Sequence, residues 1–184
     1  MKLVKIIVVS NILAFILSLM ATGVDFNFYW MSVIGPDIDK LKALNLIVHP
    51  DNLSDHAQAL FYSLFMHIGV VHLLINLILI LYLGLLPIKP WRLLLVYFTS
   101  GITGNVAAVL IEDIAVLGAS GAILGVLGYG MVSLRQDRDL FKDMFWITAL
   151  SVIPGLFLPG VSNGAHIGGL ITGISIGIFS RLHV

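Results

Sequence analysis

The chain has 184 residues, of which 59% are hydrophobic and 11% charged, and its mean hydropathy is +1.04. Soluble domains carry about 25% charged residues, so this composition indicates a protein whose solvent is the lipid bilayer. Ten Lys and Arg balance ten Asp and Glu, which argues against a nucleic-acid partner, and the absence of cysteine excludes disulfides, thiol catalysis and thiolate metal sites.

Six stretches are apolar enough to cross a hydrocarbon core of about 30 Å, which takes roughly 20 helical residues. They cover residues 6–24, 70–86, 93–111, 115–134, 144–158 and 165–180. We therefore predict an all-α, polytopic membrane protein with six transmembrane helices in a single domain over residues 1–184. The first stretch is longer than a signal-peptide core of roughly 7–15 residues, which favours a retained span over a cleaved signal.

Residues 25–69 form a polar and mixed segment after the first span, and we expect this segment to fold on the outer surface. The apolar run at 59–88 would make a helix of about 45 Å at 1.5 Å per residue, longer than the membrane is thick. We expect a break at Gly69, with the part before it partly immersed and His72 near the outer end of the second span.

The basic residues predict the orientation of the chain. With six spans, eight of them fall on one side: Lys2, Lys5, Lys89, Arg92, Arg135, Arg138, Lys142 and Arg181. Only Lys40 and Lys42 fall on the other side. The positive-inside rule then places both termini in the cytoplasm.

Polar residues within the apolar stretches are few. No acidic residue lies inside a predicted span, which excludes a pair of buried catalytic aspartates, and the only glutamate, Glu112, falls in a predicted loop. His72 and Asn76 are four residues apart, so they share one face of a helix that should look into the bundle or a watery cavity. Hydrogen bonding to neighbouring helices is an alternative role for this pair. His67 lies on a different face, and we expect it to have a local structural role.

The fourth span opens with a run of small residues, Gly118, Ala119, Ser120 and Gly121. Small neighbours leave the hydroxyl of Ser120 accessible, and a first-turn position puts it near unsatisfied backbone N–H groups. The same run is also typical of a packing surface between membrane helices.

Two helical stripes of glycine predict a close contact between the fourth and sixth spans. The first stripe is Gly169, Gly173 and Gly177 after His166, and the second is Gly121, Gly125 and Gly128 after Ser120. Contact between them would bring Ser120 and His166 within reach of each other. Serine attack needs a base at hydrogen-bond distance and donors for the oxyanion, and these two residues together with His72 and Asn76 supply both.

Three motifs, in this order along the chain, resemble those of the rhomboid family of intramembrane serine proteases. They are His67-x4-His72-x3-Asn76, Gly118-Ala119-Ser120-Gly121 and Gly164-Ala165-His166-Ile167-Gly168-Gly169. The resemblance covers the second to the sixth predicted span.

The resemblance, which is to the bacterial type of the family, implies a six-helix, rhomboid-like bundle in a bacterial inner membrane, with an active site that opens to the outer side. It implies that Ser120 is the nucleophile and His166 the general base, and that His72 and Asn76 stabilise the oxyanion with the backbone N–H of Ser120. It implies no metal and no organic cofactor. The implied substrates are single-span membrane proteins, cut near the outer membrane surface at a small residue.

The chain departs from the family pattern at two places. Leu124 stands where many rhomboids have an aromatic residue that stacks on the catalytic histidine, and Gln58 and Ala59 replace a common Trp-Arg pair. An alternative function is a catalytically inactive rhomboid-like protein that binds membrane clients. A bis-histidine haem or metal protein using His72 and His166 would explain neither the serine motif nor Asn76.

Overall fold

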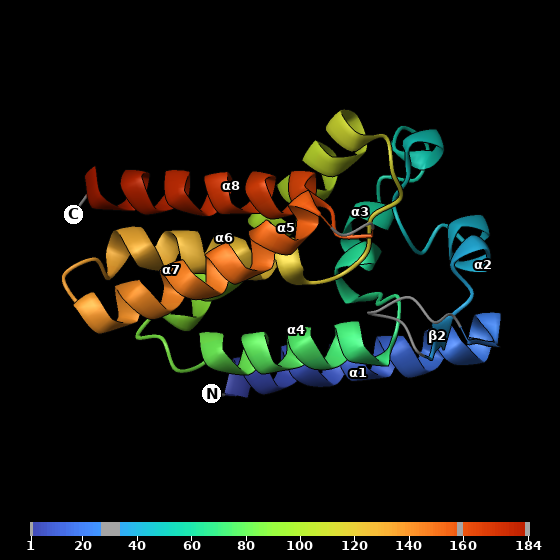
Figure 1. Cartoon of the computed structure of the whole chain (residues 1–184), viewed down its shortest axis with the longest axis horizontal. Helices are drawn as coiled ribbons and strands as arrows, with labels where there is room; N and C mark the ends of the chain where they lie inside the picture. The colour runs from blue at the N-terminus through green and yellow to red at the C-terminus, as the bar shows by residue number, and fades with distance from the viewer. Residues whose placement is uncertain (1, 27–33, 158–159, 183–184) are drawn as a thin grey trace.

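The structure is a computed structural model that describes residues 2–26, 34–157 and 160–182, and nearly all of its regular structure is helical (Figure 1). The long helices are α1 Lys2–Thr22, α4 Val70–Leu83, α5 Pro90–Glu112, α6 Ser120–Ser133, α7 Arg138–Val152 and α8 Asn163–Leu182. The shorter elements are the antiparallel strands β1 Val24–Asp25 and β2 Gly35–Pro36, the helices α2 Ile38–Ala43 and α3 Ala59–Tyr62, and the 3-10 turns η1 Pro50–Asn52, η2 Ser63–Phe65 and η3 Ile153–Leu156. The predicted all-α fold is confirmed.

Several helices are suited to a bilayer. Helices α1, α5 and α8 are each long and apolar enough to cross a membrane, and α3 with η2 and α4 form a bent pair that passes the same test together. Large apolar side chains are exposed on the outside of the bundle, such as Met20 at 78%, Leu85 at 73% and Leu150 at 68%. Soluble proteins rarely expose so much apolar surface to water, so the chain is a polytopic membrane protein. The count of six spans stays a prediction.

The predicted break in the second span is confirmed. The helical turns before it end at Phe65, α4 begins at Val70 with Gly69 as its N-cap, and the two parts meet at 89°. The backbone N–H of Val70 donates to the Ile34 carbonyl at 2.9 Å, so residues near the bend are tied to the segment between α1 and α4. Positions 27–33 of the predicted outer segment lie outside the described residues.

The predicted start of the fourth span at residue 115 is wrong, because α6 begins at Ser120. The backbone N–H of Val116 instead donates to the Val48 carbonyl at 2.9 Å, in an isolated antiparallel bridge. Gly118 has φ +121°, which does not fit a helix. A contact with a distant segment therefore keeps Val116 out of the helix, and residues 115–119 form a non-helical strap with a bend at residues 118 and 119.

The predicted start of the fifth span at residue 144 is also wrong, since α7 begins at Arg138. Asp137 caps this helix by accepting hydrogen bonds from the backbone N–H groups of Asp139 and Leu140. An N-cap aspartate lets a helix begin among charged residues. Position 158, where this span was predicted to end, lies outside the described residues.

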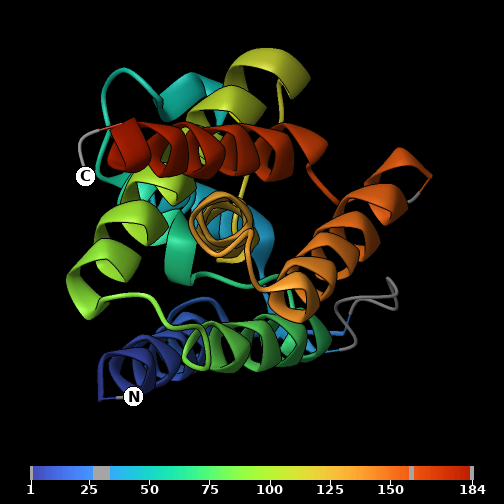
Figure 2. The ribbon, with the colours of Figure 1, turned by 90° about the vertical axis from the view of Figure 1, so that its left-hand side faces the viewer.

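Helix α6 is the centre of the bundle. Figure 2 shows it end-on in yellow-orange, with the other long helices around it. Its residues from Gly121 to Gly130 are all buried, as expected for a helix that is apolar on every side. At 14 residues it is about 20 Å long, shorter than the apolar core of a bilayer.

The predicted contact between the two glycine stripes is confirmed. A Cβ atom at Gly169 would collide with the backbone of Gly121, and one at Gly173 would collide with the backbone of Gly125. Helix α5 joins the same contact, because a Cβ at Gly104 would lie 2.6 Å from the Ala165 carbonyl oxygen. The backbone of α8 therefore lies directly against the backbones of both α5 and α6.

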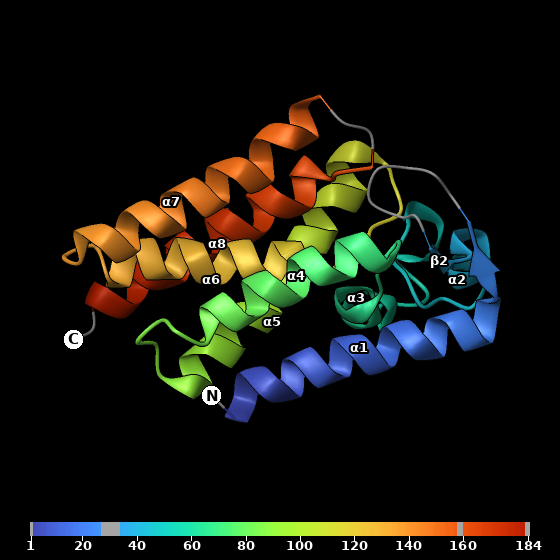
Figure 3. The ribbon, with the colours of Figure 1, turned by 60° about the horizontal axis from the view of Figure 1, so that its bottom comes forward.

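The two ends of the bundle differ in charge. Helix α1 begins and α8 ends at one end, whereas α2, β2 and α3 gather at the other (Figures 1 and 3). The eight basic residues that the sequence analysis assigned to one side lie near the start of α1, the start of α5, the turn between α6 and α7, and the end of α8. The start of α1 and the end of α8 thus lie at the same end of the bundle (Figure 1), and that this end faces the cytoplasm stays a prediction.

Candidate active site

Ser120 is the first residue of α6, so it lies in the first turn as expected, although the helix begins five residues later than predicted. The strap that leads to it is held on the outer segment, because the Gly118 backbone N–H donates to the Ser63 carbonyl at 2.8 Å. The Ser63 hydroxyl in turn accepts from the backbone N–H of Val48 at 2.8 Å. The position of Ser120 therefore depends on residues far away in the sequence.

Gly118 serves two purposes beside the serine. Its φ of +121° is one that residues with a side chain rarely adopt. A Cβ here would also lie 2.7 Å from Cε1 of His72, so the imidazole of His72 packs against the bare backbone of the strap. The absence of a side chain at Gly118 lets α4 present His72 next to Ser120.

His166 lies in the first turns of α8 and is 7% exposed. Its Nε2 is 2.9 Å from Oγ of Ser120, a hydrogen bond between α6 and α8. The predicted approach of these two residues is confirmed as geometry. The glycine contacts one turn deeper explain why the two helices can come so close.

A cavity of about 450 Å³ contains this pair. His72 and Asn76 line it together with Ser120 and His166, so the structure brings together all four candidate residues. One N–H of the Asn76 side-chain amide donates to the His72 carbonyl at 2.8 Å, and the same group has a second N–H. Asn76 and His72 are thus potential hydrogen-bond donors that line the same cavity as Ser120.

The remaining candidate histidine has a different setting. His67 is buried and is not among the residues lining the cavity, and its Nδ1 lies 3.1 Å from the Phe65 carbonyl. Its ring meets that of His72 edge-on, with 5.1 Å between the ring centroids. These contacts agree with the local structural role expected for His67.

The rim of the cavity comes partly from α2, which contributes Ile38 and Lys42. Asp37 caps this helix by accepting a hydrogen bond from the Lys40 backbone N–H at 3.1 Å. That hydrogen bond holds the pKa of Asp37 below its ordinary value. Lys42 forms an ion pair with Asp39 at 3.0 Å.

Sequence reasoning missed two residues at this site, Glu112 and Ser162. Glu112 is the last residue of α5, and its carboxylate accepts a hydrogen bond from the Ser162 hydroxyl at 2.5 Å. Ser162 immediately precedes α8, where serine is a favoured N-cap residue. That pattern could have identified Ser162, whereas Glu112 is brought to it only by the fold.

The arrangement can support a proton transfer. A neutral imidazole accepts a hydroxyl proton through Nε2, and the resulting alkoxide is a strong nucleophile. Among the described residues no carboxylate is hydrogen-bonded to His166. Ser120 and His166 therefore form a dyad, with no acidic third member among those residues. Within the same residues, no group of three or more His, Asp or Glu side chains is placed to hold a metal ion.

Comparison with known proteins gives consistent matches. The Rhomboid domain family model matches residues 54–182. RHOMBOID-like protein 6, mitochondrial, of Arabidopsis thaliana is 32% identical over 156 residues, which are 78% of this chain and 50% of that protein. Rhomboid protease GluP of Bacillus subtilis (strain 168) is 32% identical over 116 residues, 59% of this chain and 23% of that protein.

The relatives also include proteins named as inactive. Inactive rhomboid protein 2 of Homo sapiens is 32% identical over 148 residues, 74% of this chain and 17% of that protein. The chain spans half or less of the length of these three relatives. The match to the family model covers every element from α3 to α8, and the chain belongs to the rhomboid family of integral membrane proteins.

Proposed function

We propose that this protein is an intramembrane serine endopeptidase that works through a dyad of Ser120 and His166. The observation that carries the proposal is the hydrogen bond of 2.9 Å between Ser120 Oγ and His166 Nε2, inside a cavity shared with His72 and Asn76. A packing role for these polar groups would not require all four to line one cavity.

In the proposed first step, His166 Nε2 takes the Ser120 proton while Oγ attacks the carbonyl carbon of the scissile peptide bond. The carbonyl oxygen becomes an oxyanion, which the Ser120 backbone N–H, Asn76 and His72 stabilise. Ser120 begins α6, so its N–H has no partner within the helix. When the intermediate collapses, the imidazolium of His166 gives its proton to the leaving amine.

The second half of the reaction reverses these roles. His166, neutral again, takes a proton from water, which attacks the acyl-enzyme ester. The second tetrahedral intermediate expels Ser120 Oγ, which regains its proton from His166, and the product carries a new carboxylate. Neither half needs a cofactor, because only one proton moves between the reacting groups and His166.

The proposed substrates are single-span membrane proteins, cut near the outer membrane surface at a small residue where the helix unwinds readily. The size and apolar surroundings of the cavity suit an unwound peptide segment, since α4 and α7 contribute Ile75, Leu79 and Leu150 to its lining. The proposed orientation places Ser120 at the outer side, with the basic end of the bundle in the cytoplasm. A bacterial inner membrane stays a prediction, because the relatives come from plants, a bacterium and human.

A second candidate function is supported by the relatives named as inactive. A rhomboid-like protein without catalysis would use the same cavity to bind a membrane client. Such a protein would have no need of the short contact between Ser120 and His166.

Cleavage of a panel of single-span substrates by the purified protein in proteoliposomes tests the proposal. We expect a defined product with the wild type and none with Ser120→Ala, because the nucleophile is lost. Equal cleavage by Ser120→Ala would contradict the serine mechanism. Substrate binding without cleavage by the wild type would favour the client-binding alternative.

A further inference from the structure

The first turn of α8 is held by a carboxylate from another helix. Glu112 Oε1 accepts from the Gly164 backbone N–H at 2.7 Å, and Oε2 accepts from the Ser162 hydroxyl at 2.5 Å. Ser162 Oγ accepts from the Ala165 N–H at 3.0 Å, and the Ser162 carbonyl accepts from the His166 N–H at 3.2 Å. Glu112 and Ser162 thus bind three consecutive N–H groups that end at His166.

This contact does more than an ordinary helix cap. A serine alone is sufficient to cap a helix. Here the capping serine, Ser162, also donates a hydrogen bond to Glu112, the last residue of α5. Gly164 lets the two backbones touch, since a Cβ there would lie 2.8 Å from Cα of Ala108. The contact therefore fixes the spacing of α5 and α8 at the level of His166.

The departure at Leu124 makes such a contact important. Leu124 is a buried residue of α6, one turn after Ser120. A leucine side chain has no flat face on which an imidazole can stack. The orientation of His166 then depends more heavily on the backbone of the turn that carries it.

We propose that Glu112 and Ser162 are positioning residues for His166, an inference that rests on the proposed function. Their hydrogen bonds fix the first turn of α8 so that Nε2 of His166 meets Ser120.

The test compares Ser162→Ala with Ser162→Thr in the full chain. Ser162→Ala removes the hydroxyl, and we expect kcat to fall about tenfold or more because the base is misplaced. Ser162→Thr keeps the hydroxyl and should restore kcat to within about threefold of the wild type. Glu112→Gln should lower kcat with little change in KM, since Glu112 itself does not line the cavity.

Asp113→Asn is the matched control for Glu112→Gln. Asp113 is the exposed neighbour of Glu112 with φ +54°, a conformation that asparagine also tolerates, so activity should stay at the wild-type level. Wild-type kcat in Ser162→Ala would overturn the inference. Equal loss in Ser162→Ala and Ser162→Thr would overturn it too, because the hydroxyl would then be irrelevant.

Hydrogen exchange separates this inference from the proposed function. Ser162→Ala should increase amide exchange in the first turn of α8, at residues 164–166, and leave the first turn of α6 unchanged. If the wild type neither cleaves nor reacts with a serine probe, the proposed function fails. Unchanged amide exchange in Ser162→Ala would show, independently of activity, that Glu112 and Ser162 do not hold the first turn of α8.

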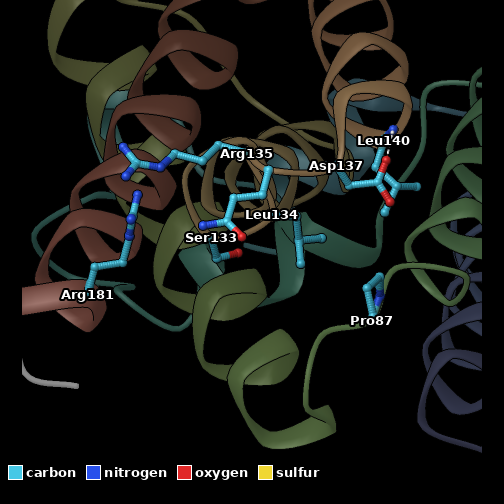
Figure 4. A pocket seen from close by; sticks show the side chains of 8 residues that line it. Pro87, Ser133, Leu134, Arg135, Asp137, Leu140 and Arg181 are labelled. Atoms are coloured by element: carbon cyan, nitrogen blue, oxygen red, sulfur yellow. Dashed lines mark hydrogen bonds between the residues drawn. The ribbon is translucent and has the colours of Figure 1, made fainter.

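A different observation concerns the opposite end of the bundle, where two arginines converge. Arg135, in the turn between α6 and α7, and Arg181, in the last turn of α8, line one cavity of about 330 Å³ and point their guanidinium groups toward each other (Figure 4). Within the described part of the chain neither of them forms an ion pair. Asp137 lines the same cavity, but its carboxylate caps α7 through Asp139 and Leu140.

Two guanidinium groups that face each other repel unless an anion lies between them. Their planar N–H groups match the oxygens of a phosphate. Pro87, Leu134 and Leu140 give the cavity apolar walls, and exposed apolar side chains such as Leu182 at 74% lie at the same end. We propose that this cavity binds an anionic phospholipid through its phosphate, with the acyl chains against the apolar surface of the helices.

Native mass spectrometry of the full chain from a neutral detergent tests this proposal. Phosphatidylglycerol should be retained about tenfold more strongly by the wild type than by the double variant Arg135→Gln with Arg181→Gln. Arg138→Gln is the matched control, because Arg138 is a neighbouring basic residue that does not line the cavity, and it should retain the lipid like the wild type.

Two results would overturn the lipid site. Equal retention by the double variant and the wild type would show that the arginine pair does not bind the lipid. Displacement of phosphatidylglycerol by millimolar inorganic phosphate would show that free phosphate is the preferred anion. Phosphatidylcholine, titrated in parallel, should be retained equally by all the variants.

Discussion

Helices α6 and α8 meet through their backbones, whereas α1 and α4 meet through side chains. Gly169 and Gly173 leave no room for a Cβ against α6. At the other contact a Cβ on Gly84 would lie 3.2 Å from the Leu81 carbonyl oxygen of its own helix and 3.2 Å from the Cγ2 methyl of Val4, so the atom that it meets on α1 belongs to a side chain. The first contact has one possible register, and the second can adjust.

The difference explains where the site lies. A hydrogen bond of 2.9 Å between residues of two helices needs those helices to keep their register within a fraction of an ångström. Backbone contacts between glycines give that register, and flexible side chains do not. The candidate dyad lies on the rigid contact, and α1 exposes much of its apolar surface, including Leu13 and Leu17.

The largest effect should come from adding one methyl group to the rigid contact. Gly173→Ala would push a Cβ into the backbone of Gly125, and we expect the free energy of unfolding to fall by about 3 kcal/mol, with loss of activity. Gly84→Ala is the matched change at the adjustable contact and should alter stability by less than about 0.5 kcal/mol. Thermal unfolding in detergent micelles measures both, and similar losses would contradict the comparison.

The next largest effect concerns the oxyanion. Asn76→Ala leaves the helix contacts in place but removes a donor from the cavity, so we expect the cleavage rate to fall by about 10² to 10³. The melting temperature should change far less than in Gly173→Ala. A cleavage rate within a few-fold of the wild type would show that Asn76 has only a structural role.

Acidic pH should inactivate the rigid site without unfolding the bundle. His166 must be neutral to accept the serine proton, so each fall of one pH unit on the acid side lowers the rate by about tenfold. The sign follows because protonation fills Nε2 and removes the base. Initial rates measured in proteoliposomes check this, and a flat profile from about pH 4 to 8 would argue against His166 as the base.

A smaller effect is expected in the strap before α6. Gly118→Ala combines an unfavourable φ of +121° with a contact of 2.7 Å to the His72 ring, and the strain should cost about 1–3 kcal/mol. We expect cleavage to fall about tenfold, because His72 moves away from Ser120. Wild-type activity in Gly118→Ala would show that the packing of His72 on the strap is unimportant.

Much of the site could be predicted because local sequence patterns determine it. The glycine stripes after Ser120 and His166 predicted the contact of two helices, since glycines at helical spacing let two backbones approach closely. The break at Gly69 followed from the length of an apolar run that no single helix could place in a bilayer.

The parts that could not be predicted depend on distant contacts. The strap is not helical because Val116 pairs with Val48, which lies 68 positions earlier in the sequence. Glu112 was placed in a loop, although it ends α5 and holds the turn before His166. Apolar periodicity carries no information about which loop a carboxylate will meet.

The central claim is that Ser120 is a nucleophile activated by His166. Reaction of the purified protein with a fluorophosphonate probe, followed by mass spectrometry of the labelled peptide, tests it most directly. The predicted result is a single modification on Ser120 that is lost in His166→Ala. Absence of labelling in the folded wild type, or equal labelling of His166→Ala, would contradict the claim.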